Sequence, residues 1–150
     1  KNFSFHIGRE SEPEFFGCLF RAKKNVTLSL PSGRLSKKLE RALCQALERG
    51  LLVTVYANAQ SSDAPSLRRL RRLTEAGLTL KICGQRLGSE FAIADGQSVF
   101  MGSLPTSWKP WRSAAGPAFV MQNHKMSQEI LSALESQVSV EINGVINRSH

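Results

Sequence analysis

The strongest constraint on the fold is an amphipathic helical pattern followed directly by an apolar run. Between residues 35 and 49 the apolar side chains recur at helical spacing, at Leu35, Leu39, Ala42, Leu43, Ala46 and Leu47. This spacing gives a helix one buried face. Gly50 is well suited to end it, because glycine adopts the conformation needed after a helix C-terminus. Residues 51–56 are nearly all apolar, which is typical of a strand buried on both faces of a sheet.

Helical and strand patterns alternate at short spacing along the rest of the chain. Further strands are predicted at residues 3–7, 25–30, 78–83, 91–94, 98–101, 117–121 and 140–146. Further helices are predicted from Ser11 to about Lys23, from Pro65 to Gly77 and from Ser127 to Val138. This order predicts an α/β fold with a mixed, largely parallel sheet flanked by helices. At 150 residues the chain is expected to form one domain, 1–150.

The chain is strongly basic, and this charge favours a polyanionic partner. Its net charge is +8 and its isoelectric point is about 9.9. Nucleic acid is the first expectation and an anionic membrane surface is the second. The alternative is a basic surface kept for solubility. No apolar run approaches the roughly 20 residues of a membrane span, so no membrane span is predicted.

The cysteines and histidines predict neither a disulfide framework nor a cofactor. The three cysteines are odd in number and have no C-x-x-C spacing: Cys18, Cys44 and Cys83. They lie in apolar periodic segments, so we expect buried free thiols in a reducing compartment and an intracellular location, cytoplasmic or nucleoid/nuclear. The three histidines are too scattered for a metal site: His6, His124 and His150. The chain begins with Lys1, consistent with a mature form or a piece of a longer protein.

Residues 86–103 carry the most specific motif of the chain. They resemble the signature of the phospholipase D-like phosphodiesterases: His-x-Lys, four residues, Asp, six residues, Gly-Ser, one residue and Asn. Asp95, the six-residue gap, Gly102 and Ser103 are in register with this signature. The order of the predicted elements, including the helix-glycine-strand unit around Gly50, is also similar to one phospholipase D-like half, over about residues 15–138. The resemblance implies that fold. It also implies a homodimer, since members with a single half generally pair two half-sites into one active centre.

The catalytic positions of the signature are not retained. Gly88 stands at the position of the nucleophilic histidine, Glu90 at that of the phosphate-binding lysine and Pro105 at that of the asparagine. Glycine has no side chain to attack phosphorus, and a carboxylate repels a phosphate where the family places a cation. We therefore expect a catalytically inactive domain. Two alternatives stay open, a misregistered alignment and a different mechanism that uses Glu90 and Asp95 with a metal completed by His6 or His124.

The retained signature residues have structural uses as well as functional ones. Asp95 can accept hydrogen bonds from turn amides of its own hairpin. Gly102 allows a close approach of the backbone. Ser103 can offer a hydroxyl and an amide to a phosphate. For Asp95 and Gly102 the structural role is preferred, whereas for Ser103 both roles are kept.

The predicted helix from Pro65 to Gly77 carries a dense cationic face. Its arginines are Arg68, Arg69, Arg71 and Arg72. At 100° per residue they occupy one side of the helix, while Leu67, Leu70 and Leu73 span the other. Arginine suits bidentate phosphate contacts, so these four residues are candidates for nucleic-acid binding. The alternative is an ordinary solvated helix face.

A second candidate for nucleic-acid binding follows the Gly-Ser pair. The segment 107–112 interleaves two tryptophans with cations. Trp108, Lys109 and Arg112 are the candidate binding residues, because aromatic rings stack on bases and cations pair with phosphates. The alternative is that one or both tryptophans pack in the core or at a dimer interface, which is favoured for Trp111.

Together these features predict an inactive phospholipase D-like domain that binds nucleic acid, DNA first, through phosphate contacts as a homodimer. Binding is expected to be mainly electrostatic and weakly sequence-specific. One alternative is an active phosphodiesterase, nuclease or phospholipase, completed by a second chain or inactivated here by substitution. Another is a protein-interaction scaffold that holds an acidic partner.

Overall fold

The computed structural model describes residues 3–7, 11–58, 63–84, 87, 90–102 and 117–143. Within these residues eight strands form one sheet in the order β1-β7-β6-β5-β2-β3-β4-β8. The strands are β1 (Phe3–Ile7), β2 (Asn25–Leu30), β3 (Leu52–Ala57), β4 (Thr79–Cys83), β5 (Phe91–Ala94), β6 (Ser98–Gly102), β7 (Pro117–Gln122) and β8 (Val138–Asn143). The helices are α1 (Ser11–Arg21), α2 (Lys37–Glu48), α3 (Ala64–Glu75) and α4 (His124–Glu135).

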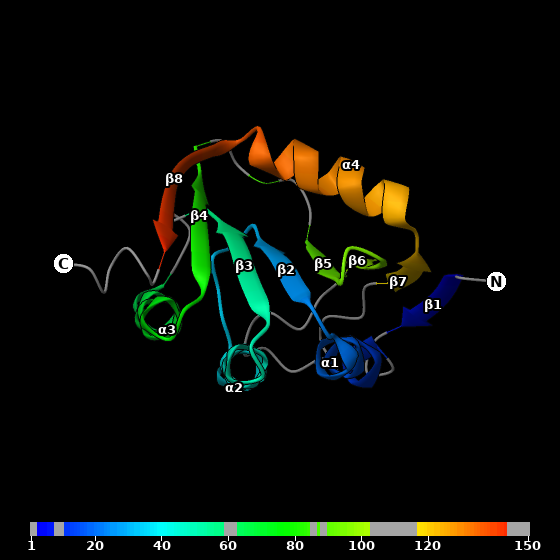
Figure 1. Ribbon diagram of the computed structural model, residues 1–150, viewed down its shortest axis with the longest axis horizontal. Coiled ribbons are helices and arrows are strands. Elements are labelled where there is room, and N and C mark those ends of the chain that lie inside the picture. The colour runs from blue at the N-terminus through cyan, green and yellow to red at the C-terminus, as the bar shows by residue number, and fades with distance from the viewer. Residues whose placement is uncertain are drawn as a thin grey trace.

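The sheet is covered unequally on its two faces. Helices α1, α2 and α3 lie side by side on one face, and α4 alone crosses the other (Figure 1). The predicted α/β class with a mixed sheet is confirmed. The parallel part is smaller than predicted, however, because β2–β3 and β3–β4 are the parallel pairings among the described strands. The other pairings are antiparallel, since hairpins and returning strands extend the sheet on both sides of this parallel centre.

Strand alternation builds the main core under α1–α3. Val26, Leu28 and Leu30 of β2 are fully buried there with alternate residues of β3 and β5. Phe100 of β6 meets Phe15 of α1 edge to face, with 5.4 Å between the ring centroids. A second, smaller cluster lies under α4. Its buried members are Tyr56, Cys83, Leu87 and Leu134.

Local capping explains where the helices begin and end. The Ser36 hydroxyl accepts a hydrogen bond from the Leu39 amide at the start of α2. Gly50 follows α2 with a φ of 87°, as expected for a glycine after a helix C-terminus. Helix α4 begins earlier than predicted because Asn123 caps it, accepting from the Met126 amide. The prediction that this helix runs to Val138 is wrong, since Val138 starts β8.

The strand directions define two ends of the sheet that matter for the site. At the signature end β2, β3 and β4 finish and β5 begins, because Ser29 of β2 pairs with Phe91 of β5. At the turn end β2 and β3 begin and β5 finishes, so Val26 pairs with Ala94. Among the described residues, no helix is long and apolar enough to cross a membrane.

Candidate functional site

The best-matched part of the signature forms a tight hairpin between β5 and β6. The Gln97 amide donates to the Ala94 carbonyl across the turn. Asp95 and Gly96, the central residues, have φ values of 57° and 66°. Aspartate and glycine tolerate this left-handed region better than most residues, which explains why an Asp-Gly pair stands here.

The Asp95 carboxylate holds a turn that is distant in sequence. It accepts hydrogen bonds from the amides of Lys23 (3.0 Å), Lys24 (2.7 Å) and Asn25 (3.1 Å), which join α1 to β2. The expectation that Asp95 bonds amides of its own hairpin is therefore wrong. Burial raises the pKa of Asp95, but the amide hydrogen bonds outweigh it, so the net pKa is lowered. Asp95 braces the turn end of the sheet.

Glu90 and Asp95 lie at opposite ends of β5. Glu90 precedes this strand at the signature end, whereas Asp95 follows it at the turn end. Five residues of extended chain span roughly 16 Å. The alternative in which these two carboxylates share a metal is therefore wrong. His124 lies at the turn end, where its Nδ1 is 3.1 Å from the Gly96 carbonyl oxygen. No group of three or more metal-ligating side chains occurs in the described part of the chain.

The signature end is braced by a residue that the sequence did not single out. Asn58 is buried directly after β3. Its side chain donates to the Cys83 carbonyl (3.0 Å) and accepts from the Leu87 amide (2.9 Å). Asn58 thus ties the end of β4 to the loop that leads into the signature. A polar residue directly after an apolar strand is the signal for such a brace, but it does not identify the partners.

A polar network fixes α4 over the parallel strands. Tyr56 of β3 and Lys81 of β4 both hydrogen-bond Glu135 in the last turn of α4. Lys81 also lies 3.6 Å from Glu141 of β8. Hydrogen bonds from Lys81 and Tyr56 lower the pKa of Glu135, while burial raises that of Tyr56. Because its members come from four elements, the sequence pattern did not reveal this network.

The four arginines of α3 divide into two pairs. Arg72 contacts both carboxylate oxygens of Glu40 in α2, at 2.9 and 3.1 Å. Arg69 donates to the Leu35 carbonyl (2.6 Å) and lies 3.9 Å from Glu40. Arg69 is largely covered, so the expectation that all four arginines share one solvated face is wrong for it. It joins α3 to α2 instead.

Arg68 and Arg71 form the exposed pair. Both are exposed, and neither side chain makes an ion pair or hydrogen bond with the described part of the chain. On the opposite side of the helix, Leu70 and Leu73 are buried, but Leu67 is 46% exposed. The predicted leucine side is therefore not fully buried. The cationic surface of α3 thus consists of Arg68 and Arg71, with the partly exposed Arg72 beside them.

Several predicted site residues cannot be placed on this framework. Gly88 and the candidates Ser103, Trp108, Lys109 and Arg112 lie outside the described residues. Gly102 ends β6 at the signature end, where it pairs with Ala118 of β7. Glu90 is partly buried at the same end.

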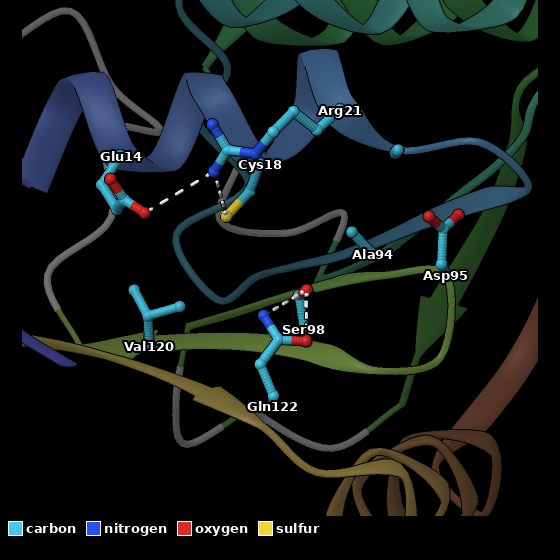
Figure 2. Close-up of a pocket in the computed structure, with 9 residues that line it drawn as sticks. Glu14, Cys18, Arg21, Ala94, Asp95, Ser98, Val120 and Gln122 are labelled. Carbon is cyan, nitrogen blue, oxygen red and sulfur yellow. Dashed lines mark hydrogen bonds and ion pairs between the residues drawn. The ribbon is translucent and has the colours of Figure 1, made fainter. Parts of the chain in front are cut away.

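A cavity of about 100 Å³ lies at the turn end, between α1 and strands β5–β7 (Figure 2). Arg21 projects over it and is held by Glu14 (3.6 Å) and by the Cys18 sulfur (3.8 Å). Burial raises the pKa of the Cys18 thiol, which disfavours the nucleophilic thiolate. All three cysteines are free thiols, as predicted, but Cys83 alone is fully buried.

The fold is that of the phospholipase D-like proteins, as the signature implied. No protein-family model and no curated protein matches the sequence. Among solved structures, the chain is similar to Nuc from Salmonella typhimurium, a phospholipase D family member, with a TM-score of 0.75 and 18% identity. The match covers 91% of this chain and 97% of Nuc.

Two further structures extend the similarity. NucT from Helicobacter pylori matches with a TM-score of 0.62 and 13% identity over 90% of this chain and 94% of NucT. The archaeal chromatin protein TrmBL2, described as showing a novel mode of DNA binding, matches with a TM-score of 0.68 and 15% identity. That match covers 91% of this chain but 52% of TrmBL2, so the chain spans about half of that protein.

Proposed function

We propose that this chain is a catalytically inactive phospholipase D-like domain that binds nucleic acid, DNA first, as an intracellular homodimer. The observation that carries the proposal is the exposed cationic pair Arg68 and Arg71, whose side chains have no ion-pair partner among the described residues. The chain as a whole has a net charge of +8. Exposed arginines attract phosphate oxygens without reading base sequence. TrmBL2, an archaeal chromatin protein described as binding DNA, supports the idea that this fold can serve such a role.

The absence of catalysis is proposed from the replaced signature positions. Gly88 provides no imidazole to form the covalent intermediate, and Glu90 adds negative charge at the place of a phosphate-binding lysine. Loss of a nucleophile alone removes several orders of magnitude in rate. In the proposal, Ser103, Trp108, Lys109 and Arg112 extend the binding surface beyond α3.

The homodimer is proposed from partly buried apolar residues on the α4 side of strands β5–β7. On β5–β7 the residues facing α1–α3 are buried, including Ala92, Phe100 and Val120. Their neighbours in the strands face the other way and are apolar. Ile93 and Val99 are buried there, whereas Phe91, Met101 and Met121 are only partly buried. We call these last three residues the open sheet face. An apolar surface of this kind fits a second copy of the chain in a two-fold contact.

The proposal is tested by measuring duplex DNA affinity against salt concentration, with a nuclease assay in parallel. We expect affinity to fall steeply with salt and no cleavage to occur. The double variant Arg68→Gln/Arg71→Gln should bind uniformly more weakly across DNA sequences, with a salt slope lower by about two. Weak, salt-insensitive binding by the wild type would contradict DNA binding. Metal-independent cleavage would favour the alternative of an active phosphodiesterase.

Glu40 offers a gain-of-binding prediction for the same surface. Glu40→Gln removes the carboxylate that holds Arg72, so a third α3 arginine becomes available to phosphate. We expect DNA affinity to rise several-fold and the salt slope to steepen by about one. Glutamine keeps the size of the side chain and one acceptor oxygen for Arg69 and Arg72, so the domain should stay folded. Glu48→Gln makes the same charge change at the end of α2 and is the control. Equal gains in both variants would mean that overall charge, not Arg72, sets the affinity.

A further inference from the structure

Helix α2 carries exposed cations of its own, besides those of α3. Lys37 and Arg41 are exposed and lie one turn apart, on the side of α2 opposite the buried Leu39. Neither of the two cationic side chains makes an ion pair or hydrogen bond with the described part of the chain. Lys38 lies instead toward α1, where its ammonium nitrogen is 4.8 Å from the centre of the Phe16 ring. Lys37 and Arg41 are therefore open to a ligand.

Helix packing joins these two cations and the arginines of α3 into one surface. Helices α2 and α3 lie side by side on the same face of the sheet (Figure 1), and Arg72 contacts both carboxylate oxygens of Glu40 between them. Lys37 stands three residues before Glu40, and Arg68 stands four residues before Arg72. Residues three or four apart are neighbours on a helix surface, with about 5–6 Å between their Cβ atoms. The Glu40–Arg72 contact thus connects the two groups of cations. We call the following residues the helical cationic face: Lys37, Arg41, Arg68, Arg71 and Arg72.

The stability of α2 does not explain where its charges stand. Lys37 and Lys38 occupy the first turn, where the helix dipole disfavours cations, and Glu48 occupies the last turn, where the dipole disfavours anions. Glu40 follows the dipole preference, but α3 engages its carboxylate. The exposed Glu48 and Glu75 stand in the last turns of α2 and α3. Positive charge therefore gathers toward the N-terminal ends of both helices, at the signature end of the sheet, where the helix dipoles also attract anions.

The other face of the sheet suits a polyanion less well. Lys81 of β4 lies on that face, and it is engaged by Glu135 and, at 3.6 Å, by Glu141. Leu52 at the start of β3 is 74% exposed there, because its neighbour in the strand packs in the main core. The prediction that residues 51–56 form a strand buried on both faces is therefore wrong at this end. Phosphate groups find more available cations on the helical side of the sheet.

We infer that, given the proposed DNA binding, a DNA duplex lies across α2 and α3 and contacts the helical cationic face. Lys37 and Arg41 then bind phosphate together with the arginines of α3, and the guanidinium of Arg41 suits bidentate contacts. Neither α2 nor α3 contains an aromatic residue, so these helices offer no platform on which unpaired bases could stack. Two packed helices instead present fixed charges to the two phosphate backbones of a duplex. Such contacts position the duplex without reading its base sequence.

The test is fluorescence anisotropy of the whole chain with a labelled DNA duplex and with a single strand of the same length. We expect tighter binding of the duplex. Lys37→Gln/Arg41→Gln should weaken duplex binding by roughly tenfold and lower the salt slope by about two. Both side chains are exposed, and Lys37 opposes the helix dipole, so thermal unfolding of this variant should occur no earlier than that of the wild type.

The matched control is Lys23→Gln/Lys24→Gln, which removes the same charge from exposed side chains of the α1–β2 turn, at the turn end. It should keep most of its affinity for the duplex. Equal loss in both variants would show a general effect of net charge and would overturn the inference.

Failure of the inference can be told apart from failure of the proposed function. No DNA binding by the wild type would overturn both. If Arg68→Gln/Arg71→Gln weakens binding but Lys37→Gln/Arg41→Gln does not, DNA binding stands and α2 is not part of the interface. Equal or tighter binding of the single strand would overturn the assignment of a duplex. Displacement of the duplex by polyglutamate at equal charge concentration would identify a surface for an acidic protein instead.

Discussion

Replacing Asp95 by alanine is expected to lower the free energy of unfolding by about 3 kcal/mol. The variant loses the acceptor for three backbone amides, those of Lys23, Lys24 and Asn25. Hydrogen bonds to a charged group contribute about 1.5–3 kcal/mol each, and their loss here is partly offset by water reaching the exposed amides. Alanine at a φ of 57° adds strain. Urea-induced unfolding of the variant and the wild type measures the difference.

Two companion variants separate the hydrogen bonds from the backbone conformation. Asp95→Gly relieves the strain of a positive φ but supplies no acceptor, so it should remain destabilised by more than about 1 kcal/mol. Asp95→Asn tolerates the conformation and keeps one acceptor oxygen, so it should lie between the glycine variant and the wild type. If Asp95→Gly were as stable as the wild type, the carboxylate contacts would contribute nothing to folding.

The same carboxylate predicts a pH dependence with a definite sign. The pKa of Asp95 in the folded chain is lowered from its ordinary value of 3.8. Its contribution to stability is therefore fully present above that ordinary value. It is lost as the pH falls through the lowered pKa of the folded state. On acidification below about pH 4, the wild type should lose stability more steeply than Asp95→Asn, as measured by urea unfolding at each pH.

Local signals predicted most of the elements well. The bounds of β1, β2 and β5 agree with the predicted ranges, because turn residues and apolar alternation mark their ends. The α4 bounds were missed since Asn123 provides a cap four residues before the predicted start at Ser127. The order of the strands in the sheet was harder to predict. Placing β5 antiparallel beside β2 depends on long-range pairing that no local pattern encodes.

The candidate site shows the same division between local and long-range information. The spacing from Asp95 to Gly102 predicted the fold correctly. The hydrogen-bond partners of Asp95 were predicted in its own hairpin, but they lie about 70 positions earlier, in the α1–β2 turn. Helical periodicity placed the α3 arginines correctly on the helix. It did not show that Glu40 of α2 engages Arg69 and Arg72, because that contact depends on helix packing. Which arginines of α3 remain exposed therefore depends on how α2 and α3 pack, and the sequence pattern does not predict it.

Placing a charge on the open sheet face is expected to abolish the proposed homodimer. Met101 lies between Phe91 and Phe119 in the strand register, at the centre of that face. Met101→Lys would put an unpaired ammonium group into an apolar contact, and burying such a group is costly. A central interface residue of this kind changes affinity by roughly a hundredfold. Sedimentation velocity over a range of concentrations should show a dimer for the wild type and a monomer for Met101→Lys.

The control is Val140→Lys on β8, which adds the same charge at an apolar residue outside the open sheet face, 52% exposed. It should remain dimeric. Because a dimer presents two α3 surfaces to one DNA molecule, Met101→Lys should also weaken DNA binding, although no arginine has been changed. A wild-type chain that is monomeric at all concentrations, or a Met101→Lys variant that stays dimeric, would contradict the two-fold contact. The second result would move the interface elsewhere, whereas full DNA affinity in a monomeric variant would show that one α3 surface is sufficient.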